Sequence, residues 1–186
     1  MHQAVISLGS NIDKEENLPE AVALLVKSGE VTAVSSVYET IPVGLSEQPT
    51  FLNAAVILHT DQTPAQLKRG ILSDIERRLK RVRQTDKNAP RTIDLDITWY
   101  DDSVHNYIGP DGQPRHIPDP DLLHFAHIAV PLAELLPEGT VHPETGEPIQ
   151  VLADRLLETT SVNEPRGLWS RPDIDLKPLL TFNLPD

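Results

Sequence analysis

The pattern of apolar positions divides the first hundred residues into two kinds of segment. Four short runs are apolar and rich in β-branched residues, as in buried or half-buried strands, and they occupy residues 4–8, 31–38, 51–59 and 93–100. Two stretches between them repeat apolar residues every three or four positions, which is the spacing of one helix face. The first helix is expected between a cap at Asn11 or Asp13 and an end at Gly29.

The second predicted helix has a clear start. Thr63 is a suitable cap, Pro64 fits the first helical position, and Gln66 is placed to complete a capping box. The apolar stripe of this helix continues to Leu79. The order of elements is therefore β-α-β-β-α-β. It predicts an α+β protein with a ferredoxin-like core, in which helices cover an antiparallel sheet.

The chain after residue 101 has a weaker pattern. Gly and Pro crowd residues 106–120, which predicts a long loop, whereas residues 126–136 and 148–157 predict helices. The remainder is rich in Pro and polar residues. We therefore expect a single domain at residues 1–163, which contains all the candidate chemistry described below, and a C-terminal tail at residues 164–186.

Composition narrows the classes of partner. Sixteen Lys and Arg against twenty-eight Asp and Glu give a net charge of −12, which argues against a general binder of nucleic-acid backbones. The sequence has no long apolar run, no signal-peptide pattern and no cysteine. We expect a cytoplasmic protein that is a monomer or a weak dimer, with no nucleic-acid or membrane partner.

The segment from Ile93 to Ile97 carries the most informative chemistry. On a strand, residues two apart point to the same side, so Asp94 and Asp96 share one face and Leu95 faces the core. Two adjacent carboxylates repel each other unless a cation lies between them, and Mg²⁺ prefers one or two carboxylates together with phosphate oxygens. The spacing alone leaves an acidic, solvated strand face as the alternative.

A local group of basic residues precedes the acidic pair. Arg81, Arg83 and Arg91 lie in or beside a predicted loop, where they can grip the phosphates of ATP, whereas Arg77 and Arg78 are expected on a solvated helix face. Cations beside a metal-binding carboxylate pair favour phosphoryl-type transfer from ATP over an acidic strand face that is merely exposed to solvent. Gly9 and Asn53 are weaker indications of a ligand site. The simpler interpretation of Gly9 is a turn, and that of Asn53 is a buried, hydrogen-bonded amide.

Four ordered blocks of sequence together resemble a known family. The blocks read SLGSN (residues 7–11), VSSVYET (34–40), QPTFLNAA (48–55) and APRTIDLDI (89–97). They are similar to blocks of 6-hydroxymethyl-7,8-dihydropterin pyrophosphokinase, over residues 4 to 137. The resemblance implies a ferredoxin-like fold and transfer of a pyrophosphoryl group from ATP to a dihydropterin, with release of AMP, in folate biosynthesis.

The resemblance also implies roles for individual residues. Two Mg²⁺ ions are expected on Asp94 and Asp96, and these two residues with Arg81 and Arg91 are the catalytic candidates. The residues expected to bind ATP are Glu76, Arg81, Arg83 and Arg91. The residues expected to bind the pterin are Thr40, Val43, Phe51, Asn53 and His127.

This sequence departs from the family pattern at several positions. Asp119 stands where the family has a nucleotide-contacting His, Phe125 where it has an Arg, and His127 where it has a Phe that stacks on the pterin. Asn88 replaces a usual aromatic. These departures leave open the hypothesis that the protein is a divergent homologue acting on another pterin. A nucleotidyltransferase with the same acidic spacing, or a pterin- or nucleotide-binding protein without catalysis, are the further alternatives.

Overall fold

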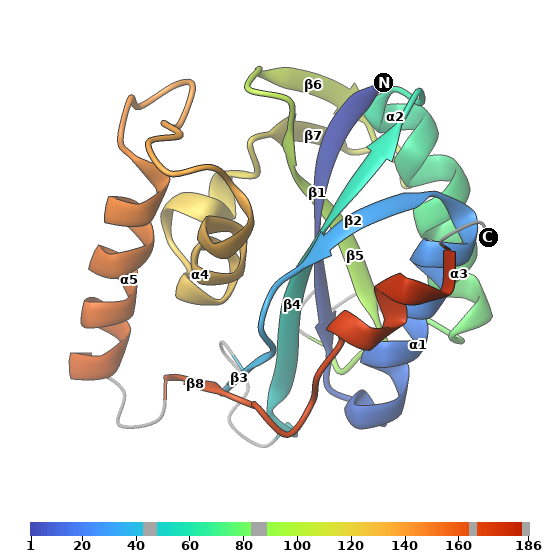
Figure 1. The fold of residues 1–186 in the computed structure, drawn as a ribbon, viewed down its shortest axis with the longest axis horizontal. Helices are drawn as coiled ribbons and strands as arrows, with labels where there is room; N and C mark the ends of the chain where they lie inside the picture. Colours follow the sequence, from blue (N-terminus) through green and yellow to red (C-terminus); the bar gives the residue numbers. More distant parts are fainter. Residues whose placement is uncertain (43–47, 83–88, 164–166, 184–186) are drawn as a thin grey trace.

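A six-stranded sheet forms the centre of the molecule (Figure 1). The computed structural model describes residues 1–42, 48–82, 89–163 and 167–183. The strands follow the order β5-β1-β4-β3-β8, with β2 also paired to β4, and every pairing is antiparallel. Their bounds are β1 His2–Ser10, β2 Glu30–Val34, β3 Tyr38–Thr40, β4 Phe51–Thr60, β5 Asp94–Tyr100 and β8 Leu168–Ser170.

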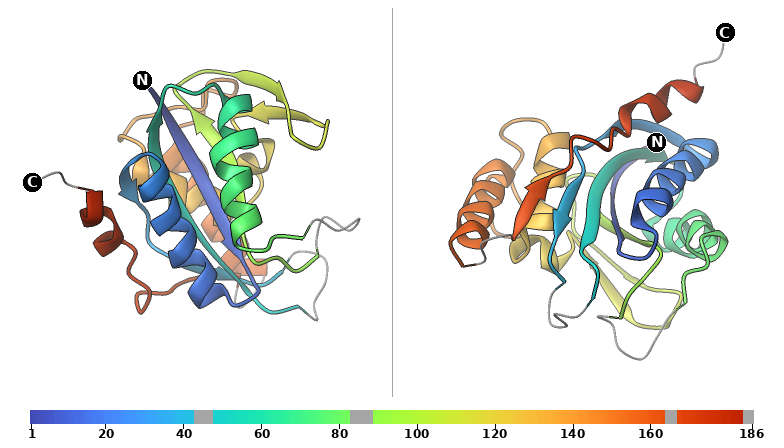
Figure 2. Two further views of the ribbon diagram at one scale, coloured as in Figure 1. Left: turned by 90° about the vertical axis from the view of Figure 1, so that its right-hand side faces the viewer. Right: turned by 90° about the horizontal axis from the view of Figure 1, so that it is seen from below.

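Helices cover both faces of this sheet (Figures 1 and 2). One face carries α1 (Lys14–Ser28) and a second helix built from α2 (Pro64–Leu67), the π-helical turn η1 (Lys68–Leu72) and α3 (Ser73–Arg78). The opposite face carries α4 (Ala126–Leu135) and α5 (Ile149–Asn163). The remaining elements are the β6–β7 hairpin (His105–Ile108 and Pro114–Ile117) and the short 3-10 helices η2 (Pro120–Leu123) and η3 (Lys177–Asn183).

Strand alternation creates two hydrophobic cores. Ile6 and Leu8 of β1 point toward α1 and α3, whereas Val5 points toward α4 and α5. Trp99 is fully buried in the second core. The predicted α+β, ferredoxin-like core is therefore confirmed, and α4 and α5 add a further layer to it. The capping box at the start of α2 is also confirmed, since Thr63 and Gln66 exchange side-chain and backbone hydrogen bonds.

Two element predictions are wrong. The single strand expected at residues 31–38 is divided, because the Ser35 hydroxyl accepts a hydrogen bond from the Ala55 backbone N–H, at 2.9 Å, and replaces a strand carbonyl there. The loop expected at residues 106–120 contains the β6–β7 hairpin. Gly112 at its turn has a φ of 77°, a conformation that suits glycine and permits the tight reversal.

The C-terminal region is more ordered than a polar tail suggests. Helix α5 extends beyond the predicted end at residue 157, β8 joins the sheet beside β3, and η3 packs on α1. The division into a catalytic domain at residues 1–163 and a tail at 164–186 stays a prediction. No helix within the described part of the chain is long and apolar enough to cross a membrane.

Candidate active site

A pocket of about 350 Å³ lies on the α4 side of the sheet. The strand register explains how distant residues meet there: Gly9 of β1 lies directly between Asn53 of β4 and Asp94 of β5, and Ser7 lies beside Asp96. Because residues opposite each other on neighbouring strands share a face, this row of side chains forms the pocket floor. Gly9, expected in a turn, lies within β1, and its missing side chain leaves this floor open.

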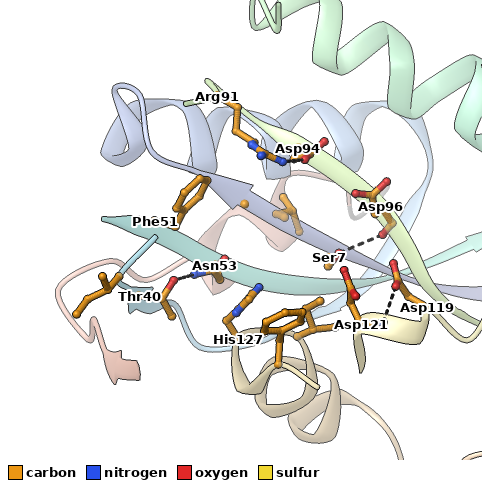
Figure 3. Close-up of a pocket in the computed structure, with 15 residues that line it drawn as sticks. Ser7, Thr40, Phe51, Asn53, Arg91, Asp94, Asp96, Asp119, Asp121 and His127 are labelled. Carbon is orange, nitrogen blue, oxygen red and sulfur yellow. Dashed lines mark hydrogen bonds and ion pairs between the residues drawn. The ribbon is translucent and has the colours of Figure 1, made fainter. Parts of the chain in front are cut away.

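One end of the pocket is acidic (Figure 3). Asp94 and Asp96 point into it, while Leu95 between them is fully buried, so the predicted alternation of β5 is confirmed. The guanidinium group of Arg91 forms an ion pair with Asp94, and Arg81 Nη2 lies 3.8 Å from Asp94 Oδ2. Burial and the neighbouring charge of Asp96 raise the pKa of Asp94.

A buried lysine supports this acidic pair from behind. Lys68 is 2% exposed, and its Nζ lies 3.0 Å from both Asp96 Oδ1 and Glu76 Oε1. Burial alone would lower the pKa of Lys68, but the charges of Asp96 and Glu76 outweigh it, so the pKa rises. Lys68 was not among the site residues predicted from sequence, although it interrupts the apolar stripe of its helix beside Leu67, which is a signal for a buried charge.

Glu76 lies inside the protein behind β5. Its Oε1 accepts hydrogen bonds from the Leu95 backbone N–H, at 3.1 Å, and from Lys68 Nζ, at 3.0 Å. The carboxylate is 5% exposed. The position of Glu76 suits the support of β5, and its expected contact with ATP stays a prediction.

Two further aspartates extend the acidic end. Asp119 and Asp121 line the pocket next to Asp96, at the start of η2 (Figure 3). Asp119 Oδ1 accepts a hydrogen bond from the Asp121 backbone N–H, at 2.9 Å. Burial raises the pKa of Asp119 to about 6, and the charge of Asp96 adds to this effect. A carboxylate therefore stands where the family resemblance implies a nucleotide-contacting histidine.

The opposite end of the pocket carries aromatic rings and an amide (Figure 3). Asn53 Nδ2 donates a hydrogen bond to Thr40 Oγ1, at 2.9 Å. The guanidinium carbon of Arg91 lies 5.6 Å from the centre of the Phe51 ring. His127 projects from α4 toward Asn53, and burial lowers its pKa to about 4, so its imidazole is neutral at pH 7.

Asn11 connects the segments around the pocket mouth. Its Oδ1 accepts a hydrogen bond from the Arg91 backbone N–H, at 2.7 Å, and its Nδ2 donates to the Pro49 carbonyl, at 3.3 Å. The sequence predicted Asn11 or Asp13 as a helix cap. Asp13 takes the N-cap position of α1, without a side-chain hydrogen bond, and Asn11 instead holds the loop that presents Arg91.

The structure brings together nearly all the predicted residues that it describes. Pocket-lining positions include Thr40, Phe51, Asn53, Arg91, Asp94, Asp96 and His127, and Arg81 lies 3.8 Å from Asp94 without lining the pocket itself. Val43, Arg83 and Asn88 lie outside the described residues. Ile41, Phe125 and Ile128 also line the pocket, but no chemical signal in the sequence distinguished them from ordinary core residues.

The acidic end supplies part of a coordination shell for Mg²⁺. Within the described ranges, no group of three or more His, Asp or Glu side chains is arranged to hold a metal ion on its own. Asp94 and Asp96 are two carboxylates on one pocket wall, with Arg81 and Arg91 close by. This set suits Mg²⁺ that arrives with a polyphosphate, because Mg²⁺ fills its octahedron with phosphate oxygens and water.

Comparison with known proteins places these features in a family. A family profile described as 7,8-dihydro-6-hydroxymethylpterin-pyrophosphokinase (HPPK) matches residues 5–137. The 2-amino-4-hydroxy-6-hydroxymethyldihydropteridine pyrophosphokinase of Bacillus subtilis is 40% identical over 135 residues, which cover 71% of this chain and 77% of that protein. The Synechocystis protein of the same name is 35% identical over 159 residues, which cover 83% and 76%.

Longer proteins contain the same region. The chain is 36% identical to the folic acid synthesis protein fol1 of Schizosaccharomyces pombe over 156 residues. These residues cover 82% of this chain but only 20% of that protein. A crystal structure of wild-type Plasmodium falciparum HPPK-DHPS shares the fold, with a TM-score of 0.65 and 14% identity, over 90% of this chain and 46% of that one. The chain belongs to the 7,8-dihydro-6-hydroxymethylpterin-pyrophosphokinase family.

Proposed function

We propose that this pocket transfers the pyrophosphoryl group of ATP to the hydroxymethyl group of 6-hydroxymethyl-7,8-dihydropterin, the family's reaction in folate biosynthesis. In this reaction the hydroxyl oxygen bonds to the β-phosphorus of ATP, and the bond between that phosphorus and the bridging oxygen of AMP breaks. The products are AMP and the pterin diphosphate. The two chemically different ends of the pocket support this assignment, since one suits a charged polyphosphate and the other a flat heterocycle.

The acidic end is the proposed site of the triphosphate. Asp94 and Asp96 would hold two Mg²⁺ ions, which neutralise the charge of the phosphate oxygens. Arg91 and Arg81 lie against Asp94 and are placed to pair with phosphate oxygens when the carboxylate is engaged. Lys68 fixes Asp96 on its inner side, so that the carboxylate is held before the substrates bind.

The aromatic end is the proposed site of the pterin. Asn53 donates its amide N–H to Thr40, which fixes the orientation of the amide and directs Oδ1 toward Gly9. A Cβ at residue 9 would lie 3.6 Å from Asn53 Oδ1, so glycine leaves this acceptor open to a donor on the pterin edge. Phe51 and the neutral imidazole of His127 supply aromatic faces on the two sides.

The row formed by Asp94, Gly9 and Asn53 is the observation that carries the proposal. Asn53 on β4 and Asp94 on β5 flank Gly9 of β1, and no side chain at residue 9 separates them, which supports a pterin end and a metal end of one reaction on the two sides of β1. The family match favours the pyrophosphokinase over the nucleotidyltransferase and over a binding protein without catalysis. Binding of the pterin hydroxymethyl group toward Asp96 would then direct it at the β-phosphorus.

The test is the metal and substrate requirement for AMP formation. Wild-type protein is expected to form AMP only when ATP, 6-hydroxymethyl-7,8-dihydropterin and Mg²⁺ are all present. The variants Asp94→Asn and Asp96→Asn are expected to lower kcat by about a thousandfold, because the metal-bound charge is lost. Asp154→Asn, on the exposed side of α5, is the matched control and keeps full activity. AMP formation without Mg²⁺, or undiminished in both site variants, would reject the assignment.

A further inference from the structure

A strap of residues 168–183 lies outside the family profile, which ends at residue 137, yet it joins the sheet next to the pocket. Strand β8 pairs with β3, so that Thr40 lies opposite Leu168 and Glu39 opposite Trp169. The strap then crosses α1, where Leu176 is 2% exposed and belongs to the first core (Figures 1 and 2). The outer edge of β3 is therefore covered by this strap.

Arg171 follows β8 and fastens the strap to the interior of the sheet edge. Its backbone N–H donates to the Val37 carbonyl, at 2.8 Å, and its Nη1 lies 2.6 Å from Glu39 Oε2. The same guanidinium group binds both carboxylate oxygens of Asp173, at 2.9 and 2.8 Å. Arg171 thus holds the strap and β3 together through one rigid, planar group.

The Glu39 carboxylate connects the strap to the start of α1 and to the residue that precedes β4. Its other oxygen, Oε1, lies 2.5 Å from Lys14 Nζ and accepts a hydrogen bond from Thr50 Oγ1. Lys14 also donates to the Thr50 carbonyl, at 3.0 Å. The Glu39 and Lys14 side chains are each 12% exposed, so this network is largely shielded from solvent screening.

Glu39 and Thr50 each have a pocket residue as their next neighbour along the chain. Thr40 follows Glu39 on β3, and Phe51 follows Thr50 at the start of β4, while Thr40 and Phe51 are themselves paired across the two strands. A displacement of Glu39 or Thr50 therefore moves the Thr40 hydroxyl, which orients Asn53, and the Phe51 ring. The network lies only one residue away from the proposed pterin contacts.

We propose that Arg171 is a positioning residue for the pterin end of the pocket, which it stabilises through Glu39, and that the C-terminal strap thereby supports this chain's substrate site from outside the pocket. The inference rests on the proposed function for the identity of the ligand. Arg171 touches neither end of the pocket, so its effect falls on the affinity for the pterin and leaves the acidic end unchanged.

Steady-state kinetics of Arg171→Ala test the proposal. The KM for 6-hydroxymethyl-7,8-dihydropterin is expected to rise by about three- to thirtyfold, the range in which residues without ligand contact change a coupled site. The KM for MgATP and kcat are expected to stay within about twofold of wild type, since Asp94 and Asp96 lie on β5, which β1 and β4 separate from β3. Arg171→Lys keeps a charge opposite Glu39 and is expected to recover part of the affinity.

Arg155→Ala is the matched control, because Arg155, an exposed residue of α5, also forms a two-pronged pair with a carboxylate, that of Glu147. Its KM for the pterin stays at the wild-type value. An unchanged pterin KM in Arg171→Ala overturns the proposal. So does an equal rise in both KM values with a lowered melting temperature, which would mark a general loss of structure.

A failure of the positioning role of Arg171 can be distinguished from a failure of the proposed function. If wild type forms AMP and Arg171→Ala binds the pterin normally, the reaction stands and the positioning role is wrong. If wild type forms no AMP, calorimetric titration of wild type and Arg171→Ala with 6-hydroxymethyl-7,8-dihydropterin decides the inference alone. Weaker binding by Arg171→Ala supports it, and equal binding, or none by either protein, overturns it.

Discussion

The Nζ atom of Lys68 lies 3.0 Å from Asp96 Oδ1, on the inner side of the strand that carries the acidic pair. The same ammonium group lies 3.0 Å from Glu76 and donates to the Leu95 carbonyl. A fully buried lysine is stable only when its charge is compensated in this way. One cation therefore holds both the carboxylate of Asp96 and the backbone of β5.

Removal of this cation is expected to destabilise the fold. Lys68→Met should lower the free energy of unfolding by about 3–5 kcal/mol, because the carboxylates of Glu76 and Asp96 lose the buried positive charge that compensates them. The double variant Lys68→Met/Glu76→Gln should recover part of this loss. Urea denaturation measures the free energy of unfolding of both variants.

The control is Arg77→Met, which breaks an exposed pair with Asp74 and should lower the free energy of unfolding by less than about 1 kcal/mol. An equally small effect of Lys68→Met would contradict the buried pairing.

Asn53→Ala is expected to weaken the pterin site selectively. Loss of the fixed amide should raise the pterin KM by about 10- to 100-fold, the effect of one buried hydrogen-bonding group, with little change in the KM for MgATP. Initial rates at varied pterin and at varied ATP separate the two constants. Asn106→Ala on the exposed hairpin is the control. A parallel rise in the KM for the pterin and the KM for MgATP would show that Asn53 supports the whole pocket and does not bind the pterin specifically.

Asp119 gives the folded protein a defined pH dependence. Its pKa rises from 3.8 to about 6 on folding, so between these values the folded state holds a proton that the unfolded state releases. The free energy of unfolding contributed by this group therefore falls as pH rises from 3.8 to about 6. Asp119→Asn should remove this contribution and stabilise the protein at pH 7 by about 1–2 kcal/mol, after allowance for solvent screening.

Thermal or urea unfolding in EDTA, at pH 4.5 and pH 7, measures this difference between wild type and Asp119→Asn. The two proteins should differ more at pH 7 than at pH 4.5. His127 has the opposite slope, since burial lowers its pKa to about 4 and stability falls as pH drops from 6.5 toward that value. This slope is common to both proteins and cancels in the comparison. A constant difference across the two pH values would be inconsistent with the raised pKa of Asp119.

Asp119→His should strengthen the binding of MgATP. The aspartate carboxylate repels a triphosphate next to Asp96, whereas a protonated imidazole attracts it, so the KM for MgATP is expected to fall by about three- to tenfold at pH 6.5. The pterin KM should not change, because Thr40 and Asn53 are at the other end of the pocket. An unchanged or higher KM for MgATP would mean that residue 119 does not face the triphosphate.

The parts of this structure that follow from local rules were predictable from sequence. Alternation along β5 places Asp94 and Asp96 together because side-chain direction on a strand depends on sequence spacing alone. The capping box at Thr63 is likewise decided by adjacent residues. The family resemblance added the expectation that four blocks far apart along the chain belong to one site, and residues of these blocks meet across the sheet.

The features that were missed depend on contacts between distant segments. Asn11 looks like a helix cap, but it accepts its hydrogen bond from Arg91, eighty residues away. Lys68 begins the π-helical turn at residues 68–72 and is buried against β5, where it donates to the Leu95 carbonyl. Strand β8 is three residues long and exists only through its pairing with β3. No local pattern specifies such pairings, because their stability comes from the partner strand.

Identification of the phosphorus-containing products is the most direct test of the central assignment. Wild-type protein is incubated with MgATP and 6-hydroxymethyl-7,8-dihydropterin, and the mixture is analysed by ³¹P NMR. The assignment predicts AMP and a pterin that carries a diphosphate, in equal amounts. ADP with a pterin monophosphate, or free pyrophosphate with a nucleotidyl pterin, would contradict it.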